Sequence, residues 1–388
     1  MRVPAKLVSS VKDFAFTVYG QVFNIGAKLP VKRRRIALFS LYDANFKDSL
    51  GEVEQELERR APGKYDIIRV DREDLFKSKK SALKFMTVDA LKMSRAKYIF
   101  INNNFMAMCR MNPNKKTEVI QLWHGQGAFK KFGYDMPQPP EVRKLEVGAN
   151  RNLTYVVCSS PYVAPFYMSA FGVTEDQIIS TGTPNEDWYF DPKNTGSAAI
   201  SAARAEFDKQ YPEAAGKYLI LYAPTFRDDP GAGSVLSHMD LSQLKAAAEE
   251  GLGREVCVMV RLHPHDPCAG KIDLEDGIMD MTSYPDINAL CLLTDLMITD
   301  YSSVCMNFAL LRRPMVFYAY DLDNYKDGRN FYFDFEEYVP GPVAKNMEEL
   351  CAVMRSRDFR TDKLEAFRHT NFGEPDGTAT KQLLDKIL

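Results

Sequence analysis

The chain has 388 residues, 45% of them apolar and 26% charged, which is enough for two folded domains with separate cores. Its net charge of -2 argues against general nucleic-acid binding. The seven cysteines form no C-x-x-C pair, which excludes a disulfide framework or zinc site of the usual pattern and is typical of a reducing compartment. No stretch approaches the roughly 18 apolar residues of a membrane span, so we expect a body on the cytoplasmic side.

Residues 1–35 differ from the rest of the chain in periodicity and charge. Eight basic residues against one acidic residue, Asp13, make this segment strongly positive. Its apolar residues recur every three or four positions, on one helical stripe: Leu7, Val11, Phe14, Val18, Val22 and Ile25. An amphipathic helix followed by Lys32-Arg33-Arg34-Arg35 predicts binding to an anionic bilayer surface. The alternative is a helix that packs on the protein's own core or on a partner.

From Ile36 onward the pattern alternates between strand and helix. Strands are predicted over residues 36–40, 65–70, 98–101, 118–122, 154–158 and 177–180, and helices over 50–60 and 81–94. This alternation is typical of a doubly wound parallel sheet, and we assign it to a first domain of residues 36–192. Each strand ends in a turn rich in Gly, Ser or Thr, and the last of these turns contains Thr183 and Asn185. Such turns gather on the edge of the sheet that faces a ligand.

Residues 191–198, rich in Pro, Gly and Ser, are predicted to link this domain to a second one that spans residues 198–388. Further strands are predicted over 218–222, 256–261, 296–298 and 315–318, with a helix over 240–251. The sequence therefore predicts two α/β domains.

The stretch from Leu296 to Tyr318 predicts a strand, a turn, a helix and a second strand. This spacing indicates a parallel pair, beyond whose carboxyl ends ligands bind. Ser302 and Ser303 fall at the predicted helix start, where hydroxyls and unpaired N–H groups form an anion site. The alternative is that this turn, which begins at Asp300, merely caps a helix.

His124 is the first candidate for catalysis. It follows a predicted strand and precedes Gly125 and Gly127, where the backbone can approach a ligand closely. An imidazole with a pKa near 6.5 can accept a proton at neutral pH. Lys130 follows within reach of an anionic group. The alternative is a histidine that bonds a turn and supports the packing of Trp123.

Two more strand ends of the second domain carry cations. Arg261 and His263, two residues apart, are expected to point to the same side and to clamp a phosphate. Thr225 and Arg227 end another strand, although the neighbouring Asp228 and Asp229 offer Arg227 a surface pairing instead.

Arg329 is a cation of the same kind. Together with Asp300 and the two serines, these groups fit the pyrophosphate of a nucleotide donor. The string His263-Pro264-His265-Asp266 also suggests a metal site, but no further ligand cluster accompanies it, so we expect no metal.

Several longer motifs follow one another in the chain: WHGxGAFKKFG from Trp123, CSSPYV, TGTPNED, APTFRDD, RLHPHD, ITDYSS and YDLDNYxxxRNFYFDFEEYVPGP. In this order they resemble the CDP-glycerol glycerophosphotransferase family, the teichoic acid primases and polymerases, from Ile36 to the final EPDGTAT segment. The resemblance implies a GT-B architecture, with two Rossmann-like domains facing across a cleft, the donor held mainly by the second, and monotopic attachment to the inner membrane face.

The resemblance also implies that His124 and His263 are the critical histidines, and that the donor site contains Asp300, Ser302, Ser303 and Arg329. This chain reads WHGQGAFKK where the family frequently has WHGTPLK, so the alditol is glycerol or ribitol.

We therefore expect a peripheral enzyme at the cytoplasmic face of the cell membrane. It would move glycerol phosphate or ribitol phosphate from CDP-glycerol or CDP-ribitol to a hydroxyl of a polyprenyl-diphosphate-linked acceptor, releasing CMP without a required cofactor. His124 would act as the base, and Arg261 and His263 would neutralise the pyrophosphate. No nucleic acid is expected as a partner, and assembly of identical copies is left open. The alternatives are a GT-B nucleotide-sugar glycosyltransferase of cell-wall or capsule synthesis and a non-catalytic assembly partner at the membrane.

Overall fold

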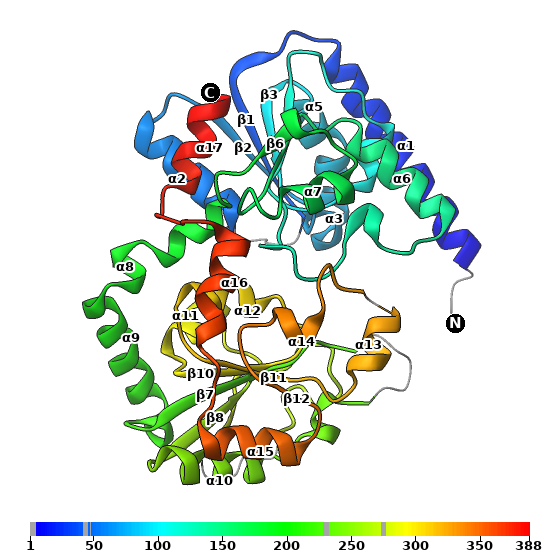
Figure 1. Cartoon of the computed structure of the whole chain (residues 1–388). Coiled ribbons are helices and arrows are strands. Elements are labelled where there is room, and N and C mark those ends of the chain that lie inside the picture. Colours follow the sequence, from blue (N-terminus) through cyan, green and yellow to red (C-terminus); the bar gives the residue numbers. More distant parts are fainter. Residues whose placement is uncertain (1–4, 42–45, 47, 228–232, 273–276, 329) are drawn as a thin grey trace. The chain divides into compact units, whose positions relative to one another are not determined.

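The computed structural model describes residues 5–41, 46, 48–227, 233–272, 277–328 and 330–388 (Figure 1). The chain folds into two compact units, the first made of Met1–Trp188 and Phe372–Leu388 and the second of Tyr189–Asn371. Each unit is built on one six-stranded sheet, and every strand pairing in both sheets is parallel. The predicted α/β class with parallel sheets is confirmed.

The sheet of the first unit has the strand order β2-β1-β3-β4-β5-β6. Its strands are β1 (Lys32–Ser40), β2 (Asp66–Asp71), β3 (Ala96–Ile101), β4 (Glu118–Gln121), β5 (Tyr155–Val157) and β6 (Ile178–Ile179). Its longer helices are α1 (Ala5–Ala27), α2 (Ser49–Arg60), α6 (Pro140–Asn150), α7 (Ala164–Phe171) and α17 (Ala379–Ile387). The second halves of β1 and β3 are largely apolar and buried, as is typical of strands in a parallel sheet that is covered on both faces, whereas the first three residues of β1 are exposed.

The helix predicted over residues 81–94 is interrupted. Two short helices, α3 (Asp74–Lys77) and α4 (Lys79–Lys84), precede a π-helical segment over Phe85–Asp89, and α5 (Ala90–Met93) follows it. Phe85 and Asp89, the first and last residues of the π-helical segment, are both buried.

The sheet of the second unit has the order β12-β11-β10-β7-β8-β9, the arrangement of a Rossmann fold, in which the order of strand addition reverses between the first and fourth strands. Those two strands are β7 (Tyr218–Ala223) and β10 (Leu296–Thr299). The others are β8 (Val256–Val260), β9 (Ile278–Asp280), β11 (Met315–Tyr318) and β12 (Val343–Ala344). The short strands β9 and β12 were not predicted, because each has only two or three residues of pattern.

Helices cover this second sheet. They are α8 (Pro192–Thr195), α9 (Ser197–Gln210), α10 (Leu241–Leu252), α11 (Ile287–Leu293), α12 (Val304–Leu310), α13 (Leu322–Gly328), α14 (Phe335–Tyr338), α15 (Met347–Ser356) and α16 (Asp362–Phe372). Residues 191–198, predicted to link the two domains, contain α8 and the start of α9, and Asp191 caps α8 by accepting a hydrogen bond from the Lys193 N–H.

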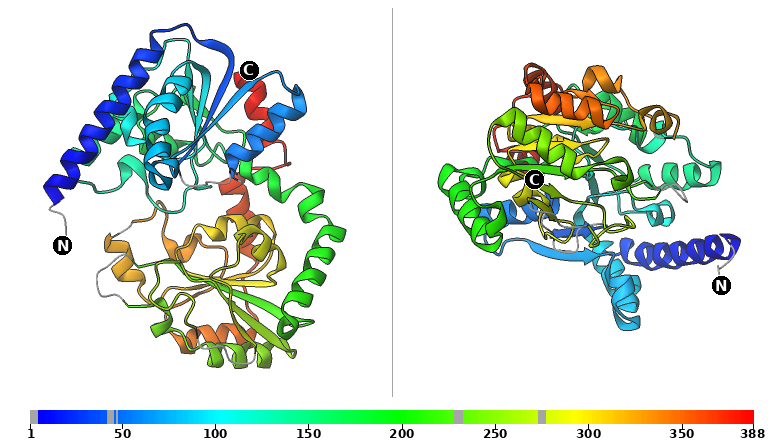
Figure 2. Two further views of the ribbon diagram at one scale, coloured as in Figure 1. Left: turned by 180° about the vertical axis from the view of Figure 1, so that it is seen from behind. Right: turned by 90° about the horizontal axis from the view of Figure 1, so that it is seen from below.

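Helix α1, the dark blue helix of Figure 2, has two apolar faces, one buried and one exposed. Tyr19 and Phe23 are buried in the first unit, and the Tyr19 ring lies 5.2 Å from that of Phe85. Phe14 and Ile25, which belong to the predicted stripe, are instead 71% and 62% exposed. The helix therefore packs on its own unit and still presents apolar side chains outward. Among the described residues, no helix is both long and apolar enough to cross a lipid bilayer.

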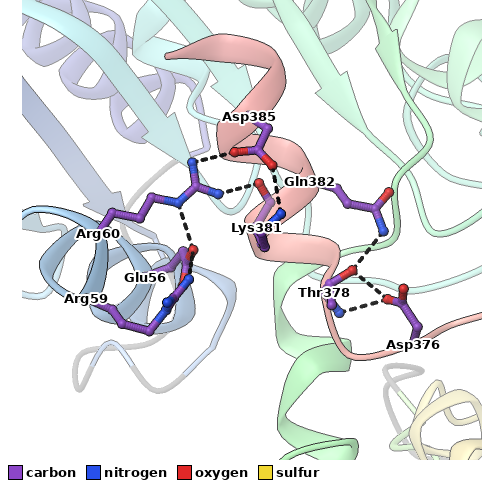
Figure 3. Close-up of polar contacts among 8 residues, drawn as sticks. All are labelled: Glu56, Arg59, Arg60, Asp376, Thr378, Lys381, Gln382 and Asp385. Carbon is purple, nitrogen blue, oxygen red and sulfur yellow. Dashed lines mark hydrogen bonds and ion pairs between the residues drawn. The ribbon is translucent and has the colours of Figure 1, made fainter.

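The C-terminal segment packs in the first unit, whereas the sequence assigned it to the second domain. Leu383 and Leu384 of α17 are completely buried in the same apolar cluster as the strands β1 and β3. The Arg60 guanidinium of α2 forms an ion pair with Asp385 at 2.8 Å and donates a hydrogen bond to the Lys381 carbonyl (Figure 3). Apolar burial is the physical reason for this return, since α17 has an apolar stripe that only a core can cover.

Asp187 fixes the start of α17. Its two carboxylate oxygens accept hydrogen bonds from the Ala379 and Thr380 N–H groups, at 2.9 and 2.8 Å. These N–H groups would otherwise lack partners at the helix start, and the negative charge suits the positive end of the helix dipole.

We expect Asp187→Ala to lower the free energy of unfolding by about 1–2 kcal/mol, because it removes both hydrogen bonds from a helix start. Thermal denaturation measures this change. The matched control is Asp385→Ala, which breaks the solvent-exposed ion pair with Arg60 and should change the melting temperature little. Equal effects of the two substitutions would contradict the assignment.

Candidate active site

The loop after β4 carries His124 and is held by its own residues. The Trp123 N–H donates to the Gln121 side-chain oxygen at 2.9 Å, and Trp123 has a positive φ of 57°, which is rare for a bulky residue. The Tyr167 hydroxyl lies 2.7 Å from the Gly125 carbonyl oxygen, and the Gly127 N–H donates to the Ser159 hydroxyl oxygen at 3.0 Å. These bonds, which involve the ends of β4 and β5 and helix α7, hold the loop in a fixed conformation.

The His124 imidazole lies against an aromatic side chain of this loop. Its ring centroid is 4.2 Å from that of Trp123, which in turn stacks on Phe132 at 5.2 Å. The side chain reaches solvent, yet the surrounding protein displaces much of its hydration. That desolvation, with a smaller contribution from the positive charge of Lys130, lowers the pKa of His124 to about 4. The imidazole is therefore neutral at pH 7 and able to accept a proton.

Thr183 and Asn185 form one network with a residue that the sequence analysis did not single out, Gln126. The Gln126 side-chain N–H₂ donates to Asn185 Oδ1 at 2.7 Å and to Thr183 Oγ1 at 3.3 Å. The Thr183 N–H and hydroxyl both donate to Glu186, at 2.9 and 2.7 Å. Burial raises the pKa of Glu186 to about 8, so this carboxyl is mostly protonated at neutral pH. Thr183, expected to meet a substrate directly, is buried and braces the turn.

In the second unit, Asp300 organises the turn after β10. Its Oδ1 accepts hydrogen bonds from the Thr225 and Tyr301 N–H groups, at 2.7 and 2.6 Å, and the residue is only 1% exposed. The turn thus receives its shape from a carboxylate inside it. Ser302 and Ser303 follow Tyr301 and are half-buried and exposed respectively, and Ser303 is the cap of α12 without a side-chain cap bond.

Arg227 lies in the middle of a buried cluster. Its Nε and Nη2 donate to the two oxygens of Asp321 at 2.7 and 2.9 Å, its Nη2 is also 2.9 Å from Asp300 Oδ2, and its Nη1 donates to the Thr225 carbonyl at 2.6 Å. Two roles were predicted for Arg227, a phosphate clamp or a surface ion pair with Asp228 and Asp229. Arg227 instead forms buried ion pairs with Asp300 and Asp321, and Asp228 and Asp229 lie outside the described residues.

Arg261 and His263 turn to different neighbours. The Nη1 of Arg261 donates to the Met281 and Tyr284 carbonyls, at 3.2 and 2.5 Å. The exposed His263 ring stacks on Phe226, with centroids 5.1 Å apart, and its Nδ1 accepts the His265 N–H at 3.2 Å. A neutral His263 therefore carries its proton on Nε2, where it can be donated to a ligand. The shared clamp expected of this pair stays a prediction.

Arg329 lies outside the described residues. Within the described ranges, no three His, Cys, Asp or Glu side chains converge in a way that could hold a metal ion.

Sequence reasoning missed Gln126, Glu186 and Asp321. All three lie inside the quoted motifs, and the position of the first two near His124 and Thr183 was a usable signal. For Asp321 nothing local indicated its partner, because Arg227 is 94 residues away in the sequence.

A family model for CDP-glycerol:poly(glycerophosphate) glycerophosphotransferases matches residues 21–388. The chain is 30% identical over 390 residues to a teichoic acid poly(ribitol-phosphate) polymerase of Bacillus spizizenii, covering 99% of this chain and 60% of that protein. It is 29% identical over 381 residues to a teichoic acid ribitol-phosphate primase of the same organism, covering 95% of both.

A solved structure of the wall teichoic acid polymerase TagF superposes with a TM-score of 0.76 at 24% identity, over 98% of this chain and 96% of that one, and so shares its fold. The resemblance inferred from the motifs is confirmed, and this chain is an enzyme of the CDP-glycerol:poly(glycerophosphate) glycerophosphotransferase family.

Proposed function

We propose that this enzyme transfers an alditol phosphate, glycerol phosphate or ribitol phosphate, from the corresponding CDP-alditol to a hydroxyl of a lipid-linked teichoic-acid-type acceptor. The oxygen of that hydroxyl forms a bond to the β-phosphorus, the bond from this phosphorus to the bridging oxygen breaks, and CMP leaves with that oxygen. The hydroxyl proton passes to the enzyme. The observation that carries the proposal is a neutral, solvent-reaching imidazole, His124, on a rigid loop of a chain that matches this family over residues 21–388.

His124 is proposed as the base. Neutral at pH 7 and in reach of solvent, it can take the proton of an attacking hydroxyl, and Lys130 beside it would attract the phosphate groups. Because a lowered pKa makes the imidazole a weaker base, His124 would not ionise the alcohol before the attack. It would accept the proton while the new bond to phosphorus forms.

The second unit is proposed to hold the CDP-alditol in a GT-B arrangement. Ser302 and Ser303 offer hydroxyl donors to the diphosphate, and the Nε2–H of His263 offers one more. Arg261 and Arg329 are proposed to add positive charge, as expected from the sequence. Positioning and charge neutralisation carry most of a phosphoryl transfer, so these groups would suffice without a required cofactor.

The enzyme is proposed to act as a peripheral protein on the cytoplasmic face of the membrane. Phe14 and Ile25 are exposed on α1, and Lys32, Arg33 and Arg34 are exposed just after it. Apolar side chains beside cations suit an anionic lipid surface. Arg35, counted with the basic run, is instead buried in an ion pair with Asp66 at 2.7 Å.

We expect His124→Ala to lower the rate of CMP release by about 10²–10⁴-fold, because the substitution removes the group that accepts the proton. Affinity for the CDP-alditol, measured by calorimetry, should stay within about threefold of wild type, since the donor is assigned to the other unit. The matched control is His369→Ala, at an exposed histidine of α16, which should leave the rate unchanged. A fully active His124→Ala variant would remove this residue from the mechanism.

The pH dependence of kcat/KM should reflect the neutral form of His124. Because the pKa is lowered to about 4, activity is retained as pH falls from 7.5 to 5.5 and is lost only as pH falls toward the lowered pKa. Initial rates across this range, taken at saturating acceptor, provide the measurement. An acid limb centred near the ordinary value of 6.5 would contradict the assignment.

A double substitution, Phe14→Ser with Ile25→Ser, should weaken binding to vesicles containing phosphatidylglycerol by at least about tenfold, since it removes two large apolar side chains from the bilayer contact. Co-sedimentation measures the bound fraction. Tyr162→Ser, at a 55% exposed aromatic residue elsewhere in the first unit, is the matched control and should bind as wild type does. Unchanged sedimentation of the double variant would exclude this face of α1 as the contact.

A further inference from the structure

Arg227 is a buried cation of the second unit that the proposed reaction does not use directly. Its side chain is only 9% exposed, and its guanidinium reaches two carboxylates and one backbone carbonyl. Its guanidinium also lies 5.1 to 5.6 Å from the centroids of three tyrosine rings: Tyr301, Tyr320 and Tyr325. The Arg227 guanidinium therefore forms hydrogen bonds and cation–π contacts at the same time.

The Arg227 cation balances the negative charges of the two buried carboxylates around it. Asp300 and Asp321 each place a carboxylate against the same guanidinium, and the Tyr301 hydroxyl donates to Asp321 at 3.0 Å. Burial by itself lowers the pKa of Arg227, but the hydrogen bonds and charges of Asp321 and Asp300 outweigh it and hold the pKa above its ordinary value. Without the cation, two buried carboxylates would lose their shared partner.

The cluster joins three strand ends that are far apart in the sequence. Arg227 follows β7, Asp300 follows β10, and Asp321 follows β11, next to α13. Asp300 in turn shapes the turn that leads to Ser302, and Tyr301 stacks on Tyr325 of α13 with centroids 3.8 Å apart. The position of the serine turn is therefore coupled to the Arg227 pairing.

We propose that Arg227 is a positioning residue, which orients the turn of Ser302 and Ser303 toward the diphosphate of the donor and does not itself bind phosphate. The inference rests on the proposed function, because it assumes that this turn contacts the donor. Three of the five guanidinium N–H groups already donate hydrogen bonds inside the unit, and Nη2 also forms an ion pair with Asp300 Oδ2, which is why a phosphate clamp is the less suitable role.

The decisive variant is Asp321→Asn, assayed in the full chain. If Arg227 were a phosphate clamp, releasing it from Asp321 would leave donor binding intact or improve it. As a positioning residue, Arg227 needs both carboxylates, so the KM for the CDP-alditol should rise at least about tenfold while kcat changes by less than about threefold. Arg227→Lys, which keeps the charge but loses the planar fork, should show the same split between KM and kcat.

The matched control is Arg313→Lys. Arg313 lies just before β11, at the opposite end of that strand from Asp321, and donates hydrogen bonds to the Leu292 and Thr294 carbonyls. This substitution should lower the melting temperature without raising the KM for the donor. A purely structural role of Arg227 would make its variants behave in the same way, with an unchanged KM.

Wild-type binding of the CDP-alditol, measured by calorimetry, separates the two proposals. If the wild-type chain binds no CDP-alditol, the proposed function fails. If it binds and Asp321→Asn binds equally well or better, only the positioning role is overturned. Should Arg227→Lys fail to fold, Asp321→Asn still decides the question.

Discussion

Complete burial of parallel strands is the constraint on which the chemistry of this protein depends. Strands such as β8, β10 and β11 are buried along their whole length, so they hold apolar side chains almost exclusively. Polar and charged groups that could meet a ligand therefore lie mostly where such strands end. Because all strands of a sheet run the same way, these ends meet at one edge, and each unit gathers its candidate residues there.

Charges that are buried at such an edge must be balanced locally. Asp300 is almost completely buried and accepts two backbone N–H groups while it shares the Arg227 cation with Asp321. In water such pairs contribute little, but in the interior each partner would be costly alone. The same desolvation that demands pairing in the second unit keeps His124 neutral in the first. One physical effect therefore produces a rigid cluster in one unit and an available base in the other.

The N-terminal helix shows how one element can meet two requirements. Tyr19 and Phe23 are buried against the first unit, while Phe14 and Ile25 remain exposed on another face. The two predictions for this helix, packing on its own core and binding to a lipid surface, are thus compatible. Packing on the core needs only one apolar face, and the second, exposed apolar face is the reason for the membrane proposal.

The sequence by itself determined the α/β class, ten of the twelve strands, the family and the loops that carry His124 and Ser302, because these follow from local apolar periodicity and contiguous motifs. Only the tertiary structure decided the partners of Arg227, the bracing of Thr183 by Gln126 and Glu186, and the return of α17 to the first unit. Those facts depend on contacts between residues many positions apart. No local pattern records which distant carboxylate will satisfy a buried guanidinium, because that choice is made by the packing of the strands around it.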